Sequence, residues 1–176
     1  MSETSKKHKS ESPARLRFAV FTCSTSRYNK SKLNEKIEDV SGDLIETTLR
    51  NAGNMIIQRD LLPDDSDVIN KSMKRVLASP EIDAAVFSGG TGIASSDVTI
   101  EAVSPFLEKT LPGFGEIFRR LSFDEIGSAA LLSRAVAGVA KGKAVFCLPG
   151  SPNAVRLCME NLVLPEAAHI VKHSRE

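Results

Sequence analysis

The chain has 176 residues, of which 41% are hydrophobic and 26% are charged, and its formal net charge is +1. This length suits one domain with a substantial core. A net charge near zero gives no overall field that attracts nucleic acid or an anionic membrane, and a chain with no tryptophan and one tyrosine lacks an aromatic platform for bases. Because no apolar run approaches the roughly 20 residues of a membrane span, we expect neither nucleic acid nor a membrane as a partner.

Residues 1–14 are polar and contain no apolar core of the kind that a secretory signal needs. We expect them to form a disordered tail, followed by a single domain over residues 15–176. The three cysteines, Cys23, Cys147 and Cys158, are odd in number and form no C-x-x-C motif. This pattern favours reduced thiols and a cytoplasmic location.

In the first half of the chain, apolar runs alternate with amphipathic segments. The patterns predict strands over residues 16–21, 55–59 and 83–87, and helices over residues 42–51 and 68–77. The first strand ends in the polar stretch "TCSTSR", for which a loop is predicted, and "LLPDDSDV" is a second loop that leads into the second helix.

The second half of the chain continues the alternation. A helix is predicted over about residues 98–107, and a further helix begins near Pro112 and ends at Gly127. Two strands joined around Gly142 follow, and the chain closes with a pair of helices interrupted by Pro165.

This order of elements predicts a three-layer α/β/α fold. Its sheet is mostly parallel, with helices on both faces and a small antiparallel excursion near residues 134–146. In such folds, ligands bind beyond the carboxyl ends of the strands. Three loops leave those ends, over residues 22–27, 88–97 and 149–153, and they are rich in hydroxyl groups, glycine and proline.

The loop "SGGTGIASSD" over residues 88–97 places three glycines within four residues. Glycine allows unusual backbone angles and lets amide N–H groups approach a ligand closely, and the start of a following helix adds free donors. These features favour a bound phosphate. The loop matches neither the Walker pattern nor the dinucleotide-binding fingerprint, and a tight turn without a ligand is the alternative.

Three aspartates accompany these loops. Asp97 lies shortly after the glycines, while Asp64 and Asp65 lie in the loop after the second strand. Carboxylates beside a phosphate need a bridging cation, and Mg²⁺ prefers a few carboxylates together with phosphate oxygens. The combination suggests metal-assisted phosphate chemistry, and helix capping is the alternative for Asp64 and Asp65.

Several motifs in order resemble the MoaB/MogA family of molybdenum cofactor biosynthesis proteins. They are "LLPDD", "SGGTG", "LPGFGE", "SRAVAGV" and "LPGSPNAV", and "FRRLSFDEIG" is similar to the MoaB branch. The resemblance covers about residues 16–172. It implies binding of molybdopterin, a pterin with a dithiolene and a terminal phosphate. It also implies adenylylation of that phosphate by ATP with Mg²⁺, which releases pyrophosphate.

The resemblance also assigns roles to individual residues. Those that would bind nucleotide and phosphate are Ser24, Ser88, Gly89, Gly90, Thr91 and Gly92. Asp64 and Asp97 would be catalytic and would hold Mg²⁺. Those that would line the pterin side are Pro149, Gly150, Ser151, Pro152 and Asn153. Ser133 and Arg134 fall in a matching motif, which structural packing explains equally well.

Two positions depart from the family pattern. Ser96 stands where many relatives have arginine, so one cation that could hold a phosphate is missing, and Thr25 stands where many have Asp or Asn. Two other functions stay open beside the adenylyltransferase. One is a non-catalytic molybdopterin-binding protein or scaffold, and the other is a nucleotide-processing enzyme of the same fold.

Assembly is a further expectation. The resemblance implies a trimer or, for the MoaB branch, a hexamer of two stacked trimers. Phe114, Phe118 and Leu121 recur at helical spacing, and this apolar face would either form a subunit contact or pack on the chain's own sheet. His169 and His173 lie four residues apart on a predicted helix, a spacing that suits a shared metal, although no third ligand is evident and a solvated helix is the alternative.

Overall fold

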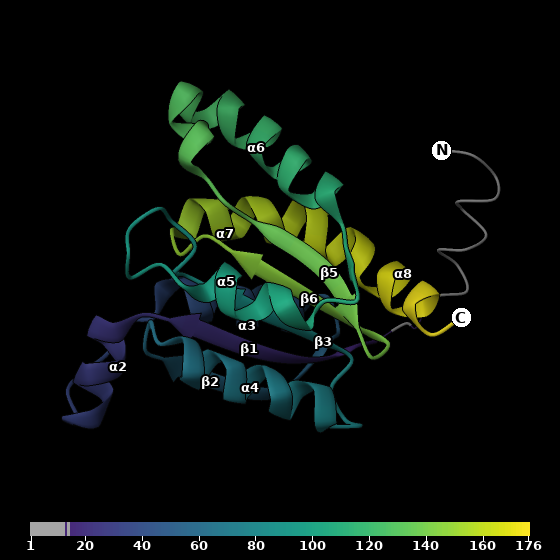
Figure 1. Ribbon diagram of the computed structural model, residues 1–176, viewed down its shortest axis with the longest axis horizontal. Coiled ribbons are helices and arrows are strands. Elements are labelled where there is room, and N and C mark those ends of the chain that lie inside the picture. Colours follow the sequence, from purple (N-terminus) through teal and green to yellow (C-terminus); the bar gives the residue numbers. More distant parts are fainter. Residues whose placement is uncertain (1–12, 14) are drawn as a thin grey trace.

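The computed structural model describes residue 13 and residues 15–176. In this part of the chain six strands form one sheet in the order β2–β1–β3–β6–β5–β4 (Figure 1). The strands are β1 (Arg17–Cys23), β2 (Met55–Leu62), β3 (Ala84–Ser88), β4 (Lys109–Thr110), β5 (Val136–Ala140) and β6 (Lys143–Leu148). Neighbours among β2, β1, β3 and β6 are parallel, whereas β5 is antiparallel to β6 and to β4. The predicted sheet is confirmed, while the predicted tail lies outside the described residues except for Pro13.

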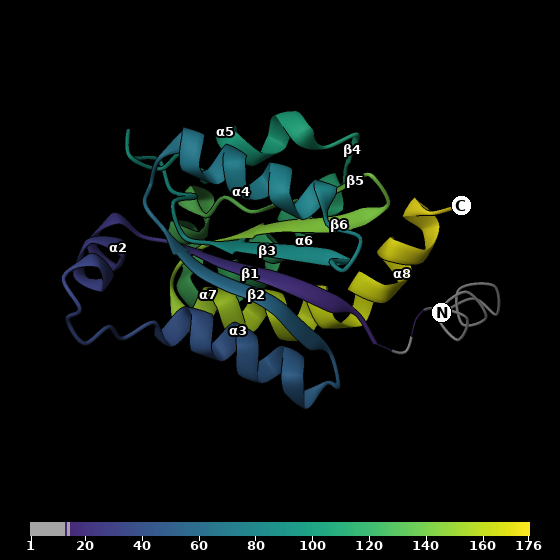
Figure 2. The same ribbon diagram turned by 90° about the horizontal axis from the view of Figure 1, so that it is seen from below.

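Helices cover both faces of this sheet, as Figure 2 shows. On one face lie α4 (Ser66–Ala78) and α5 (Thr99–Val103), and on the other lie α3 (Val40–Asn51), α7 (Pro152–Cys158) and α8 (Leu164–Ser174). At the edge where β1 ends, α2 (Thr25–Lys32) projects from the body (Figure 1). The predicted three-layer fold is therefore confirmed. No helix in the described residues is long and apolar enough to cross a membrane.

The alternation of side chains along β1 explains why helices cover both faces. Phe18 and Val20 belong to the core under α3, α7 and α8, whereas Ala19 and Phe21 belong to the core under α4 and α5. Successive strand residues point to opposite faces, so a strand buried on both sides must be apolar throughout. This is the pattern that made the strand recognisable in the sequence.

The segment α6 (Pro112–Ile126) buries the apolar face that suggested a subunit contact. Phe114 is 8% exposed and Phe118 is fully buried, and both pack in the same core as α3 and α7. Phe114 and Phe118 therefore pack on the chain's own sheet, which was the alternative to a subunit contact. The large apolar side chains that α6 and the following 3₁₀ segment η2 (Gly127–Leu132) do expose are Ile117, Phe123, Ile126, Leu131 and Leu132.

The loop predicted over residues 22–27 is wrong, because the chain enters α2 directly after Ser24. Ser24 has an extended backbone, and its hydroxyl accepts a hydrogen bond from the backbone N of Arg27 at 3.5 Å, which caps the helix. None of the residues of α2 is buried. The helix therefore lacks the apolar periodicity that identifies helices in a sequence, and its capping serine was the available signal.

Some element boundaries also differ from the prediction. β2 extends beyond residue 59 to Leu62, and the helix predicted over residues 98–107 closes at Val103 before a 3₁₀ turn. β4 has only two residues, both of them exposed. So short and polar a strand carries no alternation that the sequence could reveal.

The carboxyl-terminal helix is continuous where Pro165 predicted an interruption. A π-helical segment (Met159–Val163) joins α7 to α8, and Pro165 lies in the first turn of α8. A proline ring removes one backbone donor and crowds the preceding turn, and a locally wider turn accommodates it without ending the helix. The predicted pair of helices is thus one long helical unit.

A buried carboxylate ties three distant segments together at the end of the sheet away from the predicted loops. Asp83, which is 5% exposed, accepts hydrogen bonds from Nε of Arg17 at 2.9 Å and from Nη2 of Arg175 at 2.7 Å. Burial alone would raise the pKa of Asp83, but the two guanidinium groups outweigh it and hold that pKa well below its usual range. The start of β1, the start of β3 and the end of the chain are joined through this ion.

We predict that Asp83→Asn lowers the free energy of unfolding by about 1.5–3 kcal/mol near pH 7, the usual value of charge-assisted hydrogen bonds. Because the pKa of Asp83 is lower in the folded than in the unfolded chain, its contribution is complete above about pH 4 and is lost as the pH falls. Denaturant unfolding at pH 7 and at pH 3 measures both effects.

The matched control is Asp124→Asn, since Asp124 pairs with Arg120 at 2.8 Å but its side chain is 57% exposed. Exposed pairs contribute about 0.2–1 kcal/mol. A difference between Asp83→Asn and the unmodified protein that stays equally large at pH 3 would contradict the ionic role.

Candidate functional site

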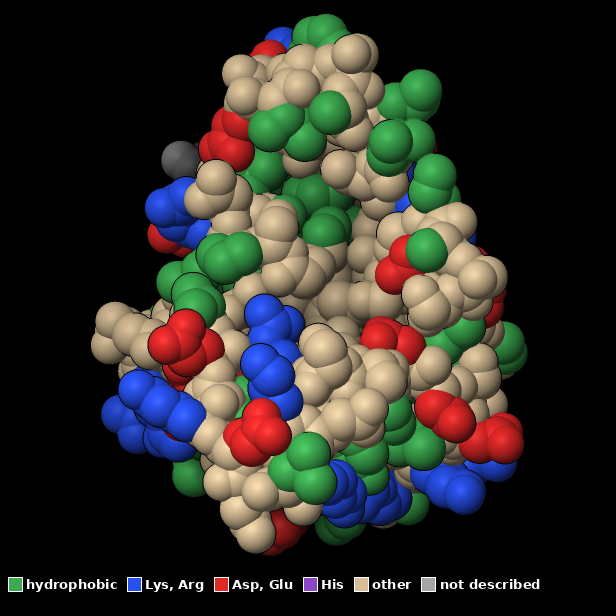
Figure 3. Space-filling view, turned by 90° about the vertical axis from the view of Figure 1, so that its left-hand side faces the viewer, with side chains coloured by type: hydrophobic (Ala, Val, Ile, Leu, Met, Phe, Trp, Pro, Cys, Tyr) green, Lys and Arg blue, Asp and Glu red, His purple; other side chains and the backbone are tan. Residues whose placement is uncertain are grey.

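The carboxyl ends of the parallel strands border a cavity of about 390 Å³. Figure 3 faces this edge of the molecule and shows a hollow near the middle of the surface, with Lys and Arg side chains beside it. The cavity is bordered by the three predicted loops and by the segment before β5. Its lining residues are Cys23, Ser24, Arg27, Asp64, Gly89, Gly90, Thr91, Gly92, Asp97, Leu132, Ser133, Arg134, Pro149 and Gly150.

The glycine loop presents backbone donors to this cavity. Gly89 and Gly90 have φ angles of +96° and +60°, in the region that favours glycine. The loop is fixed at its two ends, because Gly89 N donates to the carbonyl of Leu148 at 3.0 Å and Thr99 N donates to the carbonyl of Gly90 at 2.9 Å. Within the described residues, no acceptor receives the amide N–H of Gly90, Thr91 or Gly92. Three amide donors are thus available to an anion.

Asp64 is held at the cavity by Thr25, the first residue of α2. Its Oδ2 accepts hydrogen bonds from the backbone N of Thr25 at 2.8 Å and from Oγ1 of Thr25 at 2.9 Å. The same hydroxyl accepts a hydrogen bond from the backbone N of Asp64 at 2.9 Å. Oδ1 receives no hydrogen bond from a described residue and lies against Gly90, where an added Cβ would come within 2.9 Å of it. One oxygen of Asp64 is therefore fixed, and the other faces the loop.

Asp97 is held by its own loop. Its Oδ2 accepts a hydrogen bond from the backbone N of Ala94 at 2.9 Å, and its backbone N donates to the carbonyl of Ala94 at 2.9 Å. An added Cβ at Gly92 would lie 2.7 Å from Oδ2. Oδ1 of Asp97, like that of Asp64, has no donor in the described part of the chain. Each aspartate thus keeps one oxygen available.

These two carboxylates fit a magnesium ion that shares its ligands with a substrate. Among the described residues, no three His, Cys, Asp or Glu side chains are grouped so that they would hold a metal ion by themselves. Mg²⁺ commonly uses one or two protein carboxylates and completes its shell with water and substrate phosphates. Asp64 and Asp97 border the same cavity as the free amides, so they suit such a shared site.

Two arginines border the cavity, and they differ in what they bind. Arg134 is occupied by the protein, because its Nε donates to the carbonyl of Thr91 at 2.8 Å and its Nη1 donates to Glu101 at 2.7 Å. Hydrogen bonding to Arg134 lowers the pKa of the Glu101 carboxyl. Arg27 uses only Nε, which donates to the carbonyl of Glu38 at 3.1 Å, and no carboxylate of the described residues pairs with it.

Arg27 also borders an adjoining cavity of about 390 Å³ that contains Lys30 and Lys36. α2 and the segment after it therefore place three cations around this adjoining cavity, and Arg27 is the one that also borders the cavity of the glycine loop. Sequence reasoning missed them, because it treated the start of this segment as a loop. Arg27 lines the same cavity as Asp97, so the cavity has a cation although Ser96 provides none.

A larger cavity of about 720 Å³ lies beside α2 and β2, and its residue Arg59 is already paired with carboxylates. There, the guanidinium of Arg59 binds Asp43 at 2.6 Å, Glu46 at 2.7 Å and Asp39 at 3.0 Å. Burial alone would lower the pKa of Arg59, but these carboxylates raise it beyond its ordinary value. This network fixes α3 against β2. The cavity offers no glycine amides, so we place the functional site at the glycine loop.

Cys23 borders the site but is not a nucleophile. Its side chain is 3% exposed, and burial raises the pKa of its thiol to about 12. A protonated, buried thiol does not react as a thiolate would. The polar groups that remain in the lining are backbone amides, hydroxyl groups, carboxylates and two arginines.

Comparisons with known proteins agree with this geometry. Residues 19–169 match the family model described as "Probable molybdopterin binding domain". The chain belongs to this family.

Relatives of the same family extend over nearly the whole chain. "Molybdenum cofactor biosynthesis protein B" of Bacillus subtilis (strain 168) is 45% identical, covering 96% of this chain and 96% of its own. "Probable molybdopterin adenylyltransferase" of Methanocaldococcus jannaschii is 41% identical, covering 92% and 95% respectively. The crystal structure of "tungsten cofactor synthesizing protein MoaB" from Pyrococcus furiosus is 37% identical with a TM-score of 0.78, and covers 93% of this chain and 99% of its own. The resemblance to the MoaB branch is thereby confirmed.

Most residues predicted for the site do lie together in this member of the molybdopterin-binding family. Ser24, Asp64, the glycine loop from Gly89 to Gly92, Asp97, and Pro149 with Gly150 all line the cavity.

Other predicted residues serve the framework. Ser88 is fully buried and donates to the carbonyl of Pro149 at 3.2 Å. Ser151 caps α7 by accepting a hydrogen bond from the backbone N of Ala154 at 3.3 Å, and Pro152 and Asn153 form the first turn of that helix. Asp65 caps α4. The capping alternative is thus correct for Asp65 but not for Asp64.

We predict that Gly90→Ala weakens ATP binding at least about tenfold. The new Cβ would lie 2.5 Å from Oγ1 of Thr99 and 2.9 Å from Oδ1 of Asp64, so the loop must shift. The φ angle of +60° adds roughly 1–2 kcal/mol of backbone strain. Calorimetric titration with ATP and Mg²⁺ measures the affinity, and circular dichroism verifies the fold.

Gly53→Ala is the matched control. Gly53 also has a positive φ, +80°, but nothing lies within 4 Å of an added Cβ. This variant should lose a similar amount of stability and retain full ATP affinity. Equal ATP affinity in the two variants would mean that the glycine loop is a structural turn.

Proposed function

We propose that this protein is a molybdopterin adenylyltransferase of molybdenum cofactor biosynthesis. The observation that carries the proposal is the presence, in one cavity, of three free loop amides and two carboxylates that each keep one oxygen available. The relative from Methanocaldococcus jannaschii, named for this activity, supports it over nearly the whole chain. The three cysteines are buried and free, which suits the cytoplasmic location expected from the sequence.

In the proposed reaction, a phosphate oxygen of molybdopterin bonds to the α-phosphorus of ATP. The bond between the α- and β-phosphates breaks, and pyrophosphate leaves. The amides of Gly90, Thr91 and Gly92 bind the phosphate oxygens and are already oriented before the substrate arrives, which is the main way that proteins stabilise phosphoryl transfer. Pro149 and Gly150, which also line the cavity beside the glycine loop, are assigned to the pterin.

Asp64 and Asp97 would hold Mg²⁺, which neutralises phosphate charge and orients the phosphates when it is bound. Thr25 fixes Asp64 through the hydrogen bonds to its Oδ2, so Oδ1 is the oxygen left for the ion. Arg27 contributes a second positive charge at the side of the adjoining basic cavity. We assign this cavity to the departing pyrophosphate, because Lys30 and Lys36 border it.

The decisive experiment mixes the protein with molybdopterin, ATP and Mg²⁺ and measures pyrophosphate. Release that requires all three supports the adenylyltransferase. Binding of molybdopterin without pyrophosphate would favour the non-catalytic binding protein or scaffold. Cleavage of ATP in the absence of the pterin would favour a nucleotide-processing enzyme.

Asp97→Asn should reduce pyrophosphate release by at least about 100-fold and leave molybdopterin affinity nearly unchanged. The substitution keeps the size of the side chain and removes the charge that would bind Mg²⁺, an effect exerted mainly in the transition state. Single-turnover kinetics and a binding titration measure the two quantities.

Asp65→Asn is the control for Asp97→Asn, since Asp65 caps α4 outside the cavity and asparagine caps a helix about as well as aspartate. It should retain full turnover. An Asp97→Asn variant that releases pyrophosphate at the normal rate would remove Asp97 from the mechanism.

We also propose that copies of this chain associate into a ring-like homo-oligomer, a trimer or a hexamer of stacked trimers. The support is the apolar surface that α6 and η2 expose, since Leu131 is 83% exposed, Leu132 57% and Phe123 55%. Monomeric proteins seldom expose many large apolar side chains together. Leu132 also borders the cavity, so a neighbouring copy would lie next to the site.

Light scattering should give three or six times the single-chain mass of 19.0 kDa. Leu131→Glu should reduce that mass, because it buries a charge in the proposed contact. Leu33→Glu is the control, since Leu33 is similarly exposed, at 69%, but belongs to the end of α2. A mass near 19.0 kDa for the unmodified protein would rule out the oligomer.

A further inference from the structure

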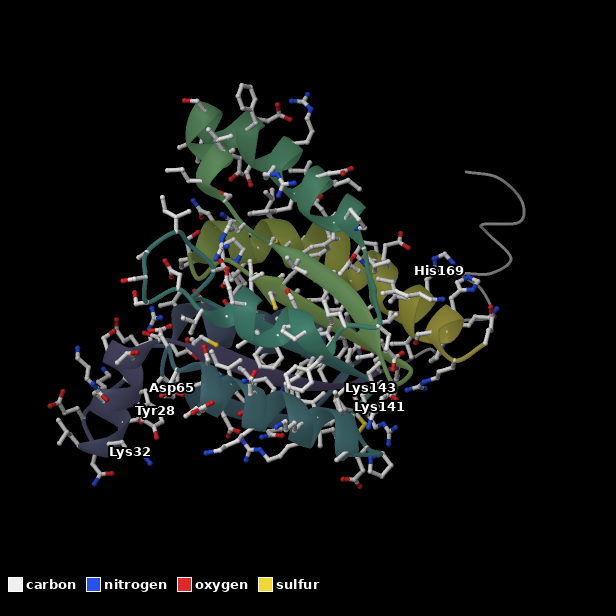
Figure 4. The ribbon with its side chains drawn as sticks, in the orientation of Figure 1. Tyr28, Lys32, Asp65, Lys141, Lys143 and His169 are labelled. Atoms are coloured by element: carbon white, nitrogen blue, oxygen red, sulfur yellow. The ribbon has the colours of Figure 1, made fainter. Side chains whose placement is uncertain are left out.

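Two histidines face each other on the last helix, far from the glycine loop. α8 carries His169 and His173 one turn apart, and their Nε2 atoms lie 2.9 Å from each other. The ring centroids are 4.7 Å apart and the ring planes meet at 63°. Figure 4 shows His169 beside the carboxyl terminus, at the opposite side of the molecule from Asp65.

The hydrogen bonds of the two rings fix where their protons lie. Nδ1 of His169 is 3.1 Å from Oε2 of Glu166, and Nδ1 of His173 is 2.7 Å from Oε2 of Glu176. An ionised carboxylate can only accept a hydrogen bond, so each Nδ1 carries the proton. In the neutral rings, both Nε2 atoms then hold lone pairs that face each other at 2.9 Å. Two lone pairs at this distance repel unless a positive ion, either a shared proton or a metal ion, lies between them.

The surroundings favour such a cation. A carboxylate bound to the Nδ1–H of a ligating histidine is the usual support of protein metal sites, because it orients the ring and raises its basicity. Both rings have this support. The pair also lies in the last two turns of α8, where the helix dipole stabilises positive charge. A cavity of about 410 Å³ adjoins the rings, bordered by Glu108 and Glu176 and also by Lys109.

The separation of the two nitrogens selects the kind of metal. With metal–nitrogen bonds of about 2.0–2.1 Å, nitrogens 2.9 Å apart subtend an angle of about 90° at the metal. This is the angle between neighbouring ligands in square-planar or tetragonal geometry, which Cu²⁺ and Ni²⁺ prefer, and it is smaller than the tetrahedral angle of Zn²⁺ sites.

We propose that His169 and His173 form a binding site for a divalent transition metal that prefers nitrogen ligands in tetragonal geometry, Cu²⁺ above Zn²⁺. The site uses the two Nε2 atoms, and water completes the coordination shell. Within the described residues no third His, Cys, Asp or Glu side chain joins a metal-holding group, so the site exchanges its metal more readily than a structural zinc site. It is independent of adenylylation, which belongs to the opposite end of the sheet.

The test titrates untagged protein with CuCl₂ and with ZnCl₂ by calorimetry and records the Cu²⁺ electron paramagnetic resonance spectrum. We expect one Cu²⁺ per chain, bound more tightly than Zn²⁺, with splitting from two nitrogens. His169→Gln and His173→Gln should each weaken Cu²⁺ binding at least about 100-fold. Glu176→Gln, which removes only the support of His173, should weaken it about 10–100-fold.

His8→Gln is the matched control, because His8 is the third histidine of the chain and is not part of the pair. It should bind Cu²⁺ like the unmodified protein. The proposal fails if no Cu²⁺ binds, if Zn²⁺ binds more tightly, if either variant of the pair retains full affinity, or if His8→Gln loses it. Circular dichroism of each variant excludes loss of the fold as the cause, and normal pyrophosphate release by the variants keeps the result separate from the proposed enzymatic function.

Discussion

The site depends on how closely three backbones approach one another at the ends of β1, β3 and β6. An added Cβ on Gly89 would lie 2.3 Å from the carbonyl oxygen of Cys23, and one on Gly150 would lie 3.1 Å from Cα of Gly89. No side chain fits between these segments. The strands are parallel and in register, so their carboxyl ends lie at the same level. The three segments that follow these strands must therefore pass through the same small space. This close contact requires glycine at these positions. The loop conformation that results leaves its amides without an acceptor in the described part of the chain.

Two hydroxyl groups near this contact hold the framework together. Ser88 bonds the carbonyl of Pro149, and Ser41 bonds the carbonyl of Gly150 at 2.7 Å. These bonds attach the loop after β6 to β3 and to α3. The position of this loop at the cavity is therefore determined by the sheet and the helix behind it. In the proposed function, a loop fixed in this way needs little rearrangement when a phosphate arrives.

Much of this could be predicted from the sequence, because the informative residues are those that periodicity and glycine content mark. The buried strands read as apolar runs, and the glycine loop was recognisable from its composition. The pair Asp64 and Asp65 shows the limit. The two residues are adjacent and chemically identical, yet one caps α4 and the other binds Thr25. Only the path of the chain around α2, a helix without buried residues, decides between those roles.

Arg27 shows the same limit of sequence-based prediction for the charges around the site. The sequence shows that an arginine is missing before Asp97, but it does not show which distant cation lies nearby. That depends on α2, whose first turn places Arg27 at the border of the cavity. Arg134 gives the converse case, since a nearby arginine is occupied by Glu101 and by the carbonyl of Thr91. Proximity in a motif therefore does not distinguish a cation that is available from one that is already paired.

The burial of Cys23 affects which sulfur chemistry can occur in the cavity. Molybdopterin carries a dithiolene, and a reactive thiolate in the same cavity would exchange with oxidised sulfur of that ligand and form a mixed disulfide. Cys23 borders the cavity, but its thiol stays protonated, because burial raises its pKa to about 12. Burial likewise raises the pKa of Cys147 and Cys158. In the proposed function, a redox-sensitive sulfur ligand would therefore occupy a cavity whose own sulfur is inert.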